Sequence, residues 1–256
     1  MLASEKFKVN IVRLLLERNA DVDRTGASNH TALMLALVSS HSDGVVRLLL
    51  QAGANVNIVV QGGQTAVEYV EIKGSFDVLT ILEKAQSIQD AINFEINYGL
   101  SSDPGGELKI ETLKKINTLP IESPEFQMIL NYIVNRIKVE QERKEFFSLE
   151  RISRARIMLI TIADRLASIY VSYVDKVIKD VLSKRLKDVL ELPFELQIEI
   201  LKRQGLQEML LGSLKLRLKR KLPFTNFDTQ IQLKNGRIVT FGFLILQEIL
   251  NRLPLS

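Results

Sequence analysis

The chain has 256 residues, of which 46% are hydrophobic and 25% are charged, and its net charge is +4. This composition is that of a globular protein with one large domain or two smaller ones. Cysteine is absent, which excludes a disulfide framework, a thiolate nucleophile and a Cys-ligated zinc site. No segment has the roughly 18 uncharged apolar residues of a membrane span, and the N-terminus shows no signal-peptide pattern.

The first third of the chain contains an internal repeat. The segment Ile11–Asp23 reappears in nearly the same form at Val45–Asn57, 34 residues later, and a weaker third copy begins at Val78. A fixed period of this length is typical of proteins built from stacked repeats. The apolar residues of each copy recur at helical spacing, so each copy predicts one helix. We expect the equivalent leucines of the first two copies to be buried between layers: Leu14, Leu15, Leu48 and Leu49.

The second copy belongs to a longer pattern that begins with Thr31 and ends with Asn57. Thr31 can cap a first helix, and Gly53 stands where a second helix must end in a left-handed turn. Asn55 and Asn57 suit the turn that leads to the next repeat. The segment resembles the ankyrin repeat, whose pattern runs Thr-Pro-Leu-His-x-Ala, then Ile-Val-x-x-Leu-Leu, then Gly-Ala-Asp-Val-Asn. The resemblance implies pairs of antiparallel helices that stack into an array.

The array is expected to be short. In the third copy Glu83 replaces the second leucine and no Gly-Ala-Asp-Val-Asn segment follows, as in a terminal repeat with a polar outer face. The first copy supplies only a second helix, so either the chain is a fragment of a longer array or its later residues stabilise the array. We predict a mainly α fold, with an ankyrin array in residues 1–86 and a helical domain in residues 87–256 that carries a small β-hairpin near the C-terminus.

The residues after the array show mostly helical patterns. The predicted helices cover residues 86–100, 107–119, a segment that starts at Pro124, 148–192 and 243–253. The segment 148–192 exceeds the usual length of one globular helix, so we expect a break in it. Its most apolar part contains Asp164 and Arg165, and we interpret it as a buried helix. Asn235-Gly236, between two alternating runs, predicts a hairpin in residues 229–241.

Few residues could carry catalytic chemistry. The two histidines are His30, at a predicted hairpin tip, and His41, where the ankyrin pattern often has a structural hydrogen bond. They cannot form an ordinary zinc site without cysteine. The sequence has no phosphate-binding glycine loop and no nucleophile elbow. We therefore predict a protein that is not an enzyme and uses no metal or cofactor. The alternative is a helical enzyme domain with an unrecognised site, whose carboxylates meet only in three dimensions.

The ankyrin resemblance implies protein–protein recognition, in the cytoplasm or, for a secreted effector, in the cytosol of a host. Stacked repeats present a concave surface, and their hairpin tips and first helices carry the variable contacts. The corresponding positions are Ser28, His30, Val38, Ser39, Gln61, Gln64, Ile72 and Lys73. These residues are mostly neutral, so electrostatic steering of a partner should be weak. The partner protein itself is not identified by the sequence.

Two further segments indicate other kinds of partner. The segment Leu192–Leu201 resembles the opening of an F-box, which implies an adaptor that links a target to a ubiquitin ligase, as in effectors of intracellular pathogens. Its expected anchors are Leu192, Pro193, Leu196, Ile200 and Leu201. The alternative is an ordinary helix start with a core face. Lys215–Lys221 could meet nucleic acid or an acidic membrane surface, but we favour a solvated helix face because aromatic stacking residues are not interleaved.

Overall fold

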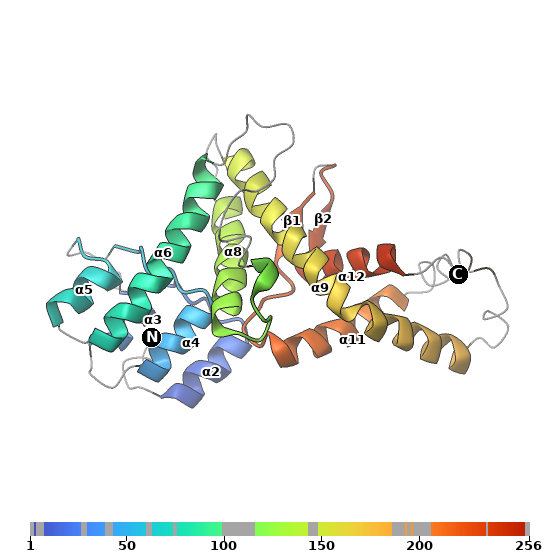
Figure 1. Ribbon diagram of the computed structural model, residues 1–256, viewed down its shortest axis with the longest axis horizontal. Coiled ribbons are helices and arrows are strands. Elements are labelled where there is room, and N and C mark those ends of the chain that lie inside the picture. Colours follow the sequence, from blue (N-terminus) through green and yellow to red (C-terminus); the bar gives the residue numbers. More distant parts are fainter. Residues whose placement is uncertain are drawn as a thin grey trace. The chain divides into compact units, whose positions relative to one another are not determined.

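The computed structural model is mainly α-helical (Figure 1). It describes residues 3, 8–26, 30–38, 43–59, 63–73, 76–98, 116–142, 148–185, 193, 196, 206–233 and 235–253. The chain divides into two compact units: Met1–Met158 with Leu222–Asn226, and Leu159–Lys221 with Phe227–Ser256. Position 86, where the sequence analysis places a domain boundary, lies inside a helix of the first unit.

The first unit begins with the repeat array. Its helices are α2 (Val9–Glu17), α3 (Ala32–Ala36), α4 (Asp43–Gln51), α5 (Ala66–Lys73) and α6 (Phe76–Tyr98). Helix α3 packs against α4 and α5 packs against α6, while α4 also packs against α2 and α6. The second helices of the three copies therefore stack in successive layers, as the 34-residue period predicts. The Thr31 hydroxyl accepts a hydrogen bond from the Met34 N–H at 3.3 Å, which confirms the predicted cap of α3.

The outer face of α2 differs from that of α4. Val45, Leu48 and Leu49 on α4 are buried, whereas the equivalent Ile11, Leu14 and Leu15 on α2 are exposed by 49%, 48% and 45%. The expectation that both leucine pairs would be buried is therefore wrong for the first copy. The physical reason is that α4 packs against α3, the first helix of its own repeat. Among the described elements, none occupies the corresponding place beside α2.

Asx turns link successive repeats at the same 34-residue spacing. The N–H of Asp23 donates to Oδ1 of Asp21 at 3.2 Å, and the N–H of Asn57 donates to Oδ1 of Asn55 at 3.0 Å. The N–H of Asn55 then donates to Oδ1 of Asp23 at 2.8 Å, which joins the first repeat to the second. These bonds explain why Asp and Asn occupy the turn positions of both copies.

The third repeat ends differently because α6 continues where the earlier copies turn. The side chain of Gln89 on α6 accepts from the Val56 N–H at 3.0 Å and donates to the Ala54 carbonyl at 2.7 Å. The Nδ2 of Asn57 donates to Oδ1 of Asp90 at 2.7 Å. The side chain of Gln89 on α6 therefore satisfies backbone groups of the loop that ends the second repeat.

Helix α8 (Pro124–Glu142) packs against α4 and α6 in the first unit. Its start agrees with the prediction, since the Ser123 hydroxyl accepts from the Phe126 N–H at 3.2 Å. Phe126, Ile129 and Leu130 are among its fully buried side chains. A helix from outside the repeats thus covers the side of the array formed by the second helices.

The second unit contains most of α9 (Ser148–Arg185), together with α11 (Leu206–Lys221), β1 (Gln230–Gln232), β2 (Ile238–Thr240) and α12 (Phe241–Arg252). The two strands pair antiparallel, with Ile231 opposite Val239, and Gly236 in the turn has φ +80°. This confirms the predicted hairpin. Helix α12 packs against α11, and its N-terminus is capped by the Thr240 hydroxyl, which accepts from the Phe243 N–H at 3.2 Å.

Helix α9 is continuous over 38 residues, so the expected break is wrong over the described range. Residues 148–185 contain no proline and no glycine, and nothing in the chain forces an interruption. The part Arg154–Asp180 is long and apolar enough to cross a membrane by length and composition, a test that core helices also pass. Leu159, Ile162 and Leu166 are fully buried, and Asp164 pairs with Arg252 of α12, which agrees with a core helix.

Candidate protein-interaction surface

Helix α8 lies close to the array at Gly53, in the turn that ends α4. Gly53 has φ +84°, in the left-handed region that the sequence predicts for this position. A Cβ atom there would lie 2.5 Å from the backbone carbon of Asn131 and 2.5 Å from the backbone nitrogen of Tyr132. The glycine therefore has a second role, close packing against α8, which the repeat pattern alone does not reveal.

Amide side chains of α8 satisfy the carbonyl groups at the end of α4. The Nδ2 of Asn131 donates to the Gln51 carbonyl at 2.8 Å, and the Nδ2 of Asn135 donates to the Gly53 carbonyl at 3.3 Å. The Oδ1 of Asn131 in turn accepts from the hydroxyl of Thr225 at 2.8 Å. These carbonyls would otherwise lack helical partners, so α8 acts as a built-in cap for α4.

Ionisable groups near α8 serve the structure. Burial raises the pKa of Asp23 to about 6, helped by the nearby charge of Asp21 and opposed by the Asn55 hydrogen bond and by Arg136. Burial also raises the pKa of Tyr132 to about 12. On α8 itself, Nη2 of Arg136 lies 2.6 Å from Oε1 of Glu140, whose side chain is completely buried. A buried pair of this kind depends strongly on both partners.

Two of the predicted contact residues lie in exposed positions at or just after the ends of the first helices. Val38, after α3, is exposed by 62%, and Ile72, near the end of α5, is exposed by 70%. They are 34 residues apart and so occupy equivalent positions in adjacent repeats. His30 and Gln64 are partly buried. Three of the remaining predicted contacts lie outside the described residues: Ser28, Ser39 and Gln61. The side chain of Lys73 also lies outside them.

The structure describes little of the F-box-like segment. Leu192, Ile200 and Leu201 lie outside the described residues, as does His41. The Leu196 N–H donates to the Pro193 carbonyl at 2.9 Å, and the Leu196 side chain is exposed by 49%.

The basic residues of α11 make contacts within the second unit. Lys215 pairs with Asp228, and the guanidinium carbon of Arg217 lies 5.2 Å from the ring centre of Tyr173. The Nζ of Lys219 lies 5.9 Å from the ring centre of Phe227.

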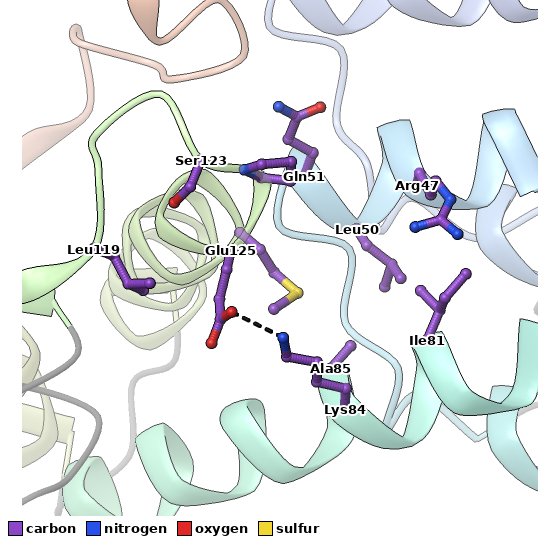
Figure 2. Close-up of a pocket in the computed structure, with 11 residues that line it drawn as sticks. Arg47, Leu50, Gln51, Ile81, Lys84, Ala85, Leu119, Ser123 and Glu125 are labelled. Atoms are coloured by element: carbon purple, nitrogen blue, oxygen red, sulfur yellow. Dashed lines mark hydrogen bonds and ion pairs between the residues drawn. The ribbon is translucent and has the colours of Figure 1, made fainter.

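A pocket of about 500 Å³ opens between the second helices α4 and α6 and the start of α8 (Figure 2). Two of its walls are formed by the second helices of adjacent repeats: Arg47, Leu50 and Gln51 on α4, and Ile81, Lys84 and Ala85 on α6. The third wall is formed by Leu119, Ser123, Pro124, Glu125 and Met128. This site is not evident from the sequence, because its third wall belongs to a segment outside the repeats.

Comparison with protein families agrees with the geometry of the first unit. Residues 1–91 match the family model of ankyrin repeats in three copies, so this part of the chain is an ankyrin-repeat array. Ankyrin repeats are generally protein–protein interaction modules and are typically non-enzymatic. A comparison with curated proteins and one with solved structures found no significant match.

Proposed function

We propose that this ankyrin array binds a segment of another cytoplasmic protein, without catalysis, on the face formed by α3, α5 and the turns that flank them. The proposal is carried by Val38 and Ile72, two large apolar side chains that are 62% and 70% exposed. Because successive repeats stack with a constant geometry, equivalent positions lie side by side on one face. An exposed apolar pair of this kind favours contact with a partner, whereas single scattered residues carry no such meaning.

The opposite side of the array supports this choice of face. The second helices α4 and α6 already pack against α8 of the same chain, so much of their surface is covered. The contact positions predicted on the first-helix face are mostly neutral. We therefore expect an affinity that comes mainly from the burial of apolar surface and depends only weakly on salt.

The test compares three versions of the full chain in proximity labelling, carried out in the cells that naturally make the protein. Val38→Asp with Ile72→Asp should reduce labelling of the partner by about tenfold or more. The matched control is Leu216→Asp on α11, because Leu216 is also exposed, by 63%, but belongs to the second unit. Circular dichroism must show that all three versions are folded. Equal labelling by the double variant and the wild type would contradict the proposed face.

The F-box resemblance yields a second, separate hypothesis, in which the chain also recruits a ubiquitin-ligase adaptor subunit. The exposed side chain of Leu196 supports this hypothesis, because an anchor residue must be accessible to the adaptor subunit. If the hypothesis is correct, Leu196→Asp with Ile200→Asp should abolish retention of the purified adaptor subunit by the full chain. Retention by neither version, or by both equally, would eliminate it.

A further inference from the structure

The pocket between α4, α6 and α8 combines an apolar base with a charged rim. Leu50, Ala85 and Met128 are buried, and they provide the base. Arg47 and Lys84 are exposed and lie on the two repeat walls (Figure 2). At about 500 Å³ the pocket falls within the roughly 300–1,000 Å³ range of ligand sites, so it is large enough to receive a bulky side chain.

The charges of the rim leave one cation available. The Nζ of Lys84 lies 2.9 Å from Oε2 of Glu125, so these two charges largely balance each other. Arg47 forms no ion pair with any residue that the structure describes. The rim therefore carries a net positive charge at Arg47, next to an apolar surface. Such a site complements a carboxylate that is held close to an apolar group.

Helix α8 shows what kind of element this side of the array accepts. It lies against α4 and α6, and Phe126, Ile129 and Leu130 in its first two turns are buried. The pocket begins at the first turn of α8, where Pro124 and Glu125 form part of its wall. The same two repeat helices thus offer a docking surface that α8 covers only in part.

We propose that this pocket is a second binding site of the array, for an acidic segment of a partner protein that inserts one large apolar side chain. The apolar side chain occupies the base formed by Leu50, Ala85 and Met128. A neighbouring aspartate or glutamate of the partner pairs with Arg47. Since the site lies on the second helices, it does not depend on Val38 or Ile72, and its test is separate from that of the first-helix face.

The experiment selects short random peptides on the full chain and then measures the affinity of the enriched peptides as fluorescein conjugates. The enriched peptides should share a large apolar residue beside an acidic one. Replacing their apolar residue by serine should weaken binding by about tenfold or more. Arg47→Glu should weaken binding similarly, and exchanging the peptide's acidic residue for lysine should restore binding to that variant.

The matched control is Arg13→Glu, because Arg13 is the equivalent, exposed arginine of the first repeat and does not line the pocket. This variant should bind the selected peptides as the wild type does. Three results would overturn the proposal. The first is an equal loss of peptide binding in Arg47→Glu and Arg13→Glu, and the second is a loss of peptide binding in Val38→Asp with Ile72→Asp but not in Arg47→Glu. The third is a failure of the lysine peptide to bind Arg47→Glu. Self-association of the wild type that Arg47→Glu abolishes would assign the pocket to a second copy and would also overturn it.

Discussion

Replacing Gly53 by alanine tests how closely α8 approaches the array. The left-handed φ of +84° costs a residue with a Cβ atom about 1–2 kcal/mol. The new Cβ would also lie 2.5 Å from backbone atoms of Asn131 and Tyr132, and a helix backbone cannot rotate away as a side chain can. Forced displacement of packed elements typically adds about 1–3 kcal/mol. We therefore expect Gly53→Ala to lower the free energy of unfolding by about 2–5 kcal/mol.

Gly63 provides the matched control for the Gly53 variant. Its φ is +79°, but a Cβ atom there would meet nothing within 4 Å. Gly63→Ala should therefore lower the free energy of unfolding only by the conformational cost of the left-handed φ, about 1–2 kcal/mol. Urea unfolding of both variants, followed by circular dichroism, measures the difference. If the two substitutions cost the same, α8 does not lie against Gly53 as described.

Hydrogen exchange locates the effect of the Gly53 substitution. Backbone amides of α8 around Asn131 and Tyr132 should exchange faster in Gly53→Ala than in the wild type, because the helix must move away from α4. In Gly63→Ala the same amides should keep their protection. Faster exchange in α8 of both variants, or in neither, would mean that the loss of stability arises elsewhere.

Three further substitutions test single contacts by urea unfolding. Burial raises the pKa of Asp23 from 3.8 to about 6, so the folded chain binds more protons than the unfolded chain in this range and stability falls as pH rises through it. Asp23→Asn, which keeps an acceptor for the Asn55 N–H, should therefore raise the free energy of unfolding by about 1–3 kcal/mol at neutral pH and hardly at all near pH 4. The same increase at both pH values would contradict this explanation. Arg136→Met should destabilise by about 3–5 kcal/mol because buried Glu140 loses this partner, and adding Glu140→Leu should recover much of the loss; no recovery would show that the pair matters little. Gln89→Ala should cost about 2–4 kcal/mol, since it removes two hydrogen bonds to buried backbone groups, and a loss below about 1 kcal/mol would argue against that role.

The repeats were predictable because their features are local. The 34-residue period fixes the stacking of the second helices, and Gly53 and Thr31 have the conformation and the hydrogen bond expected of them. The hairpin at Asn235-Gly236 is equally local, since its turn type follows from two residues. In each case a few neighbouring residues determine the structure.

The features that were missed depend on residues far apart in the sequence. The pattern of α8 predicts a helix, but only the fold shows that it packs against α4, some 80 residues earlier, as in the Asn131 bond to Gln51. The pocket has the same origin, because α8 closes a groove between two repeats. The exposure of Leu14 and Leu15 was missed because equivalence in sequence does not supply an equivalent neighbour.

The most direct test of the proposed interaction face measures whether Val38 and Ile72 lie side by side. The chain has no cysteine, so Val38→Cys with Ile72→Cys accepts two spin labels at defined positions. Packed helices lie about 8–10 Å apart, so labels on equivalent positions of adjacent repeats should show strong dipolar broadening in the electron paramagnetic resonance spectrum. A spectrum equal to the sum of the two single-label spectra would contradict a continuous face formed by the two repeats.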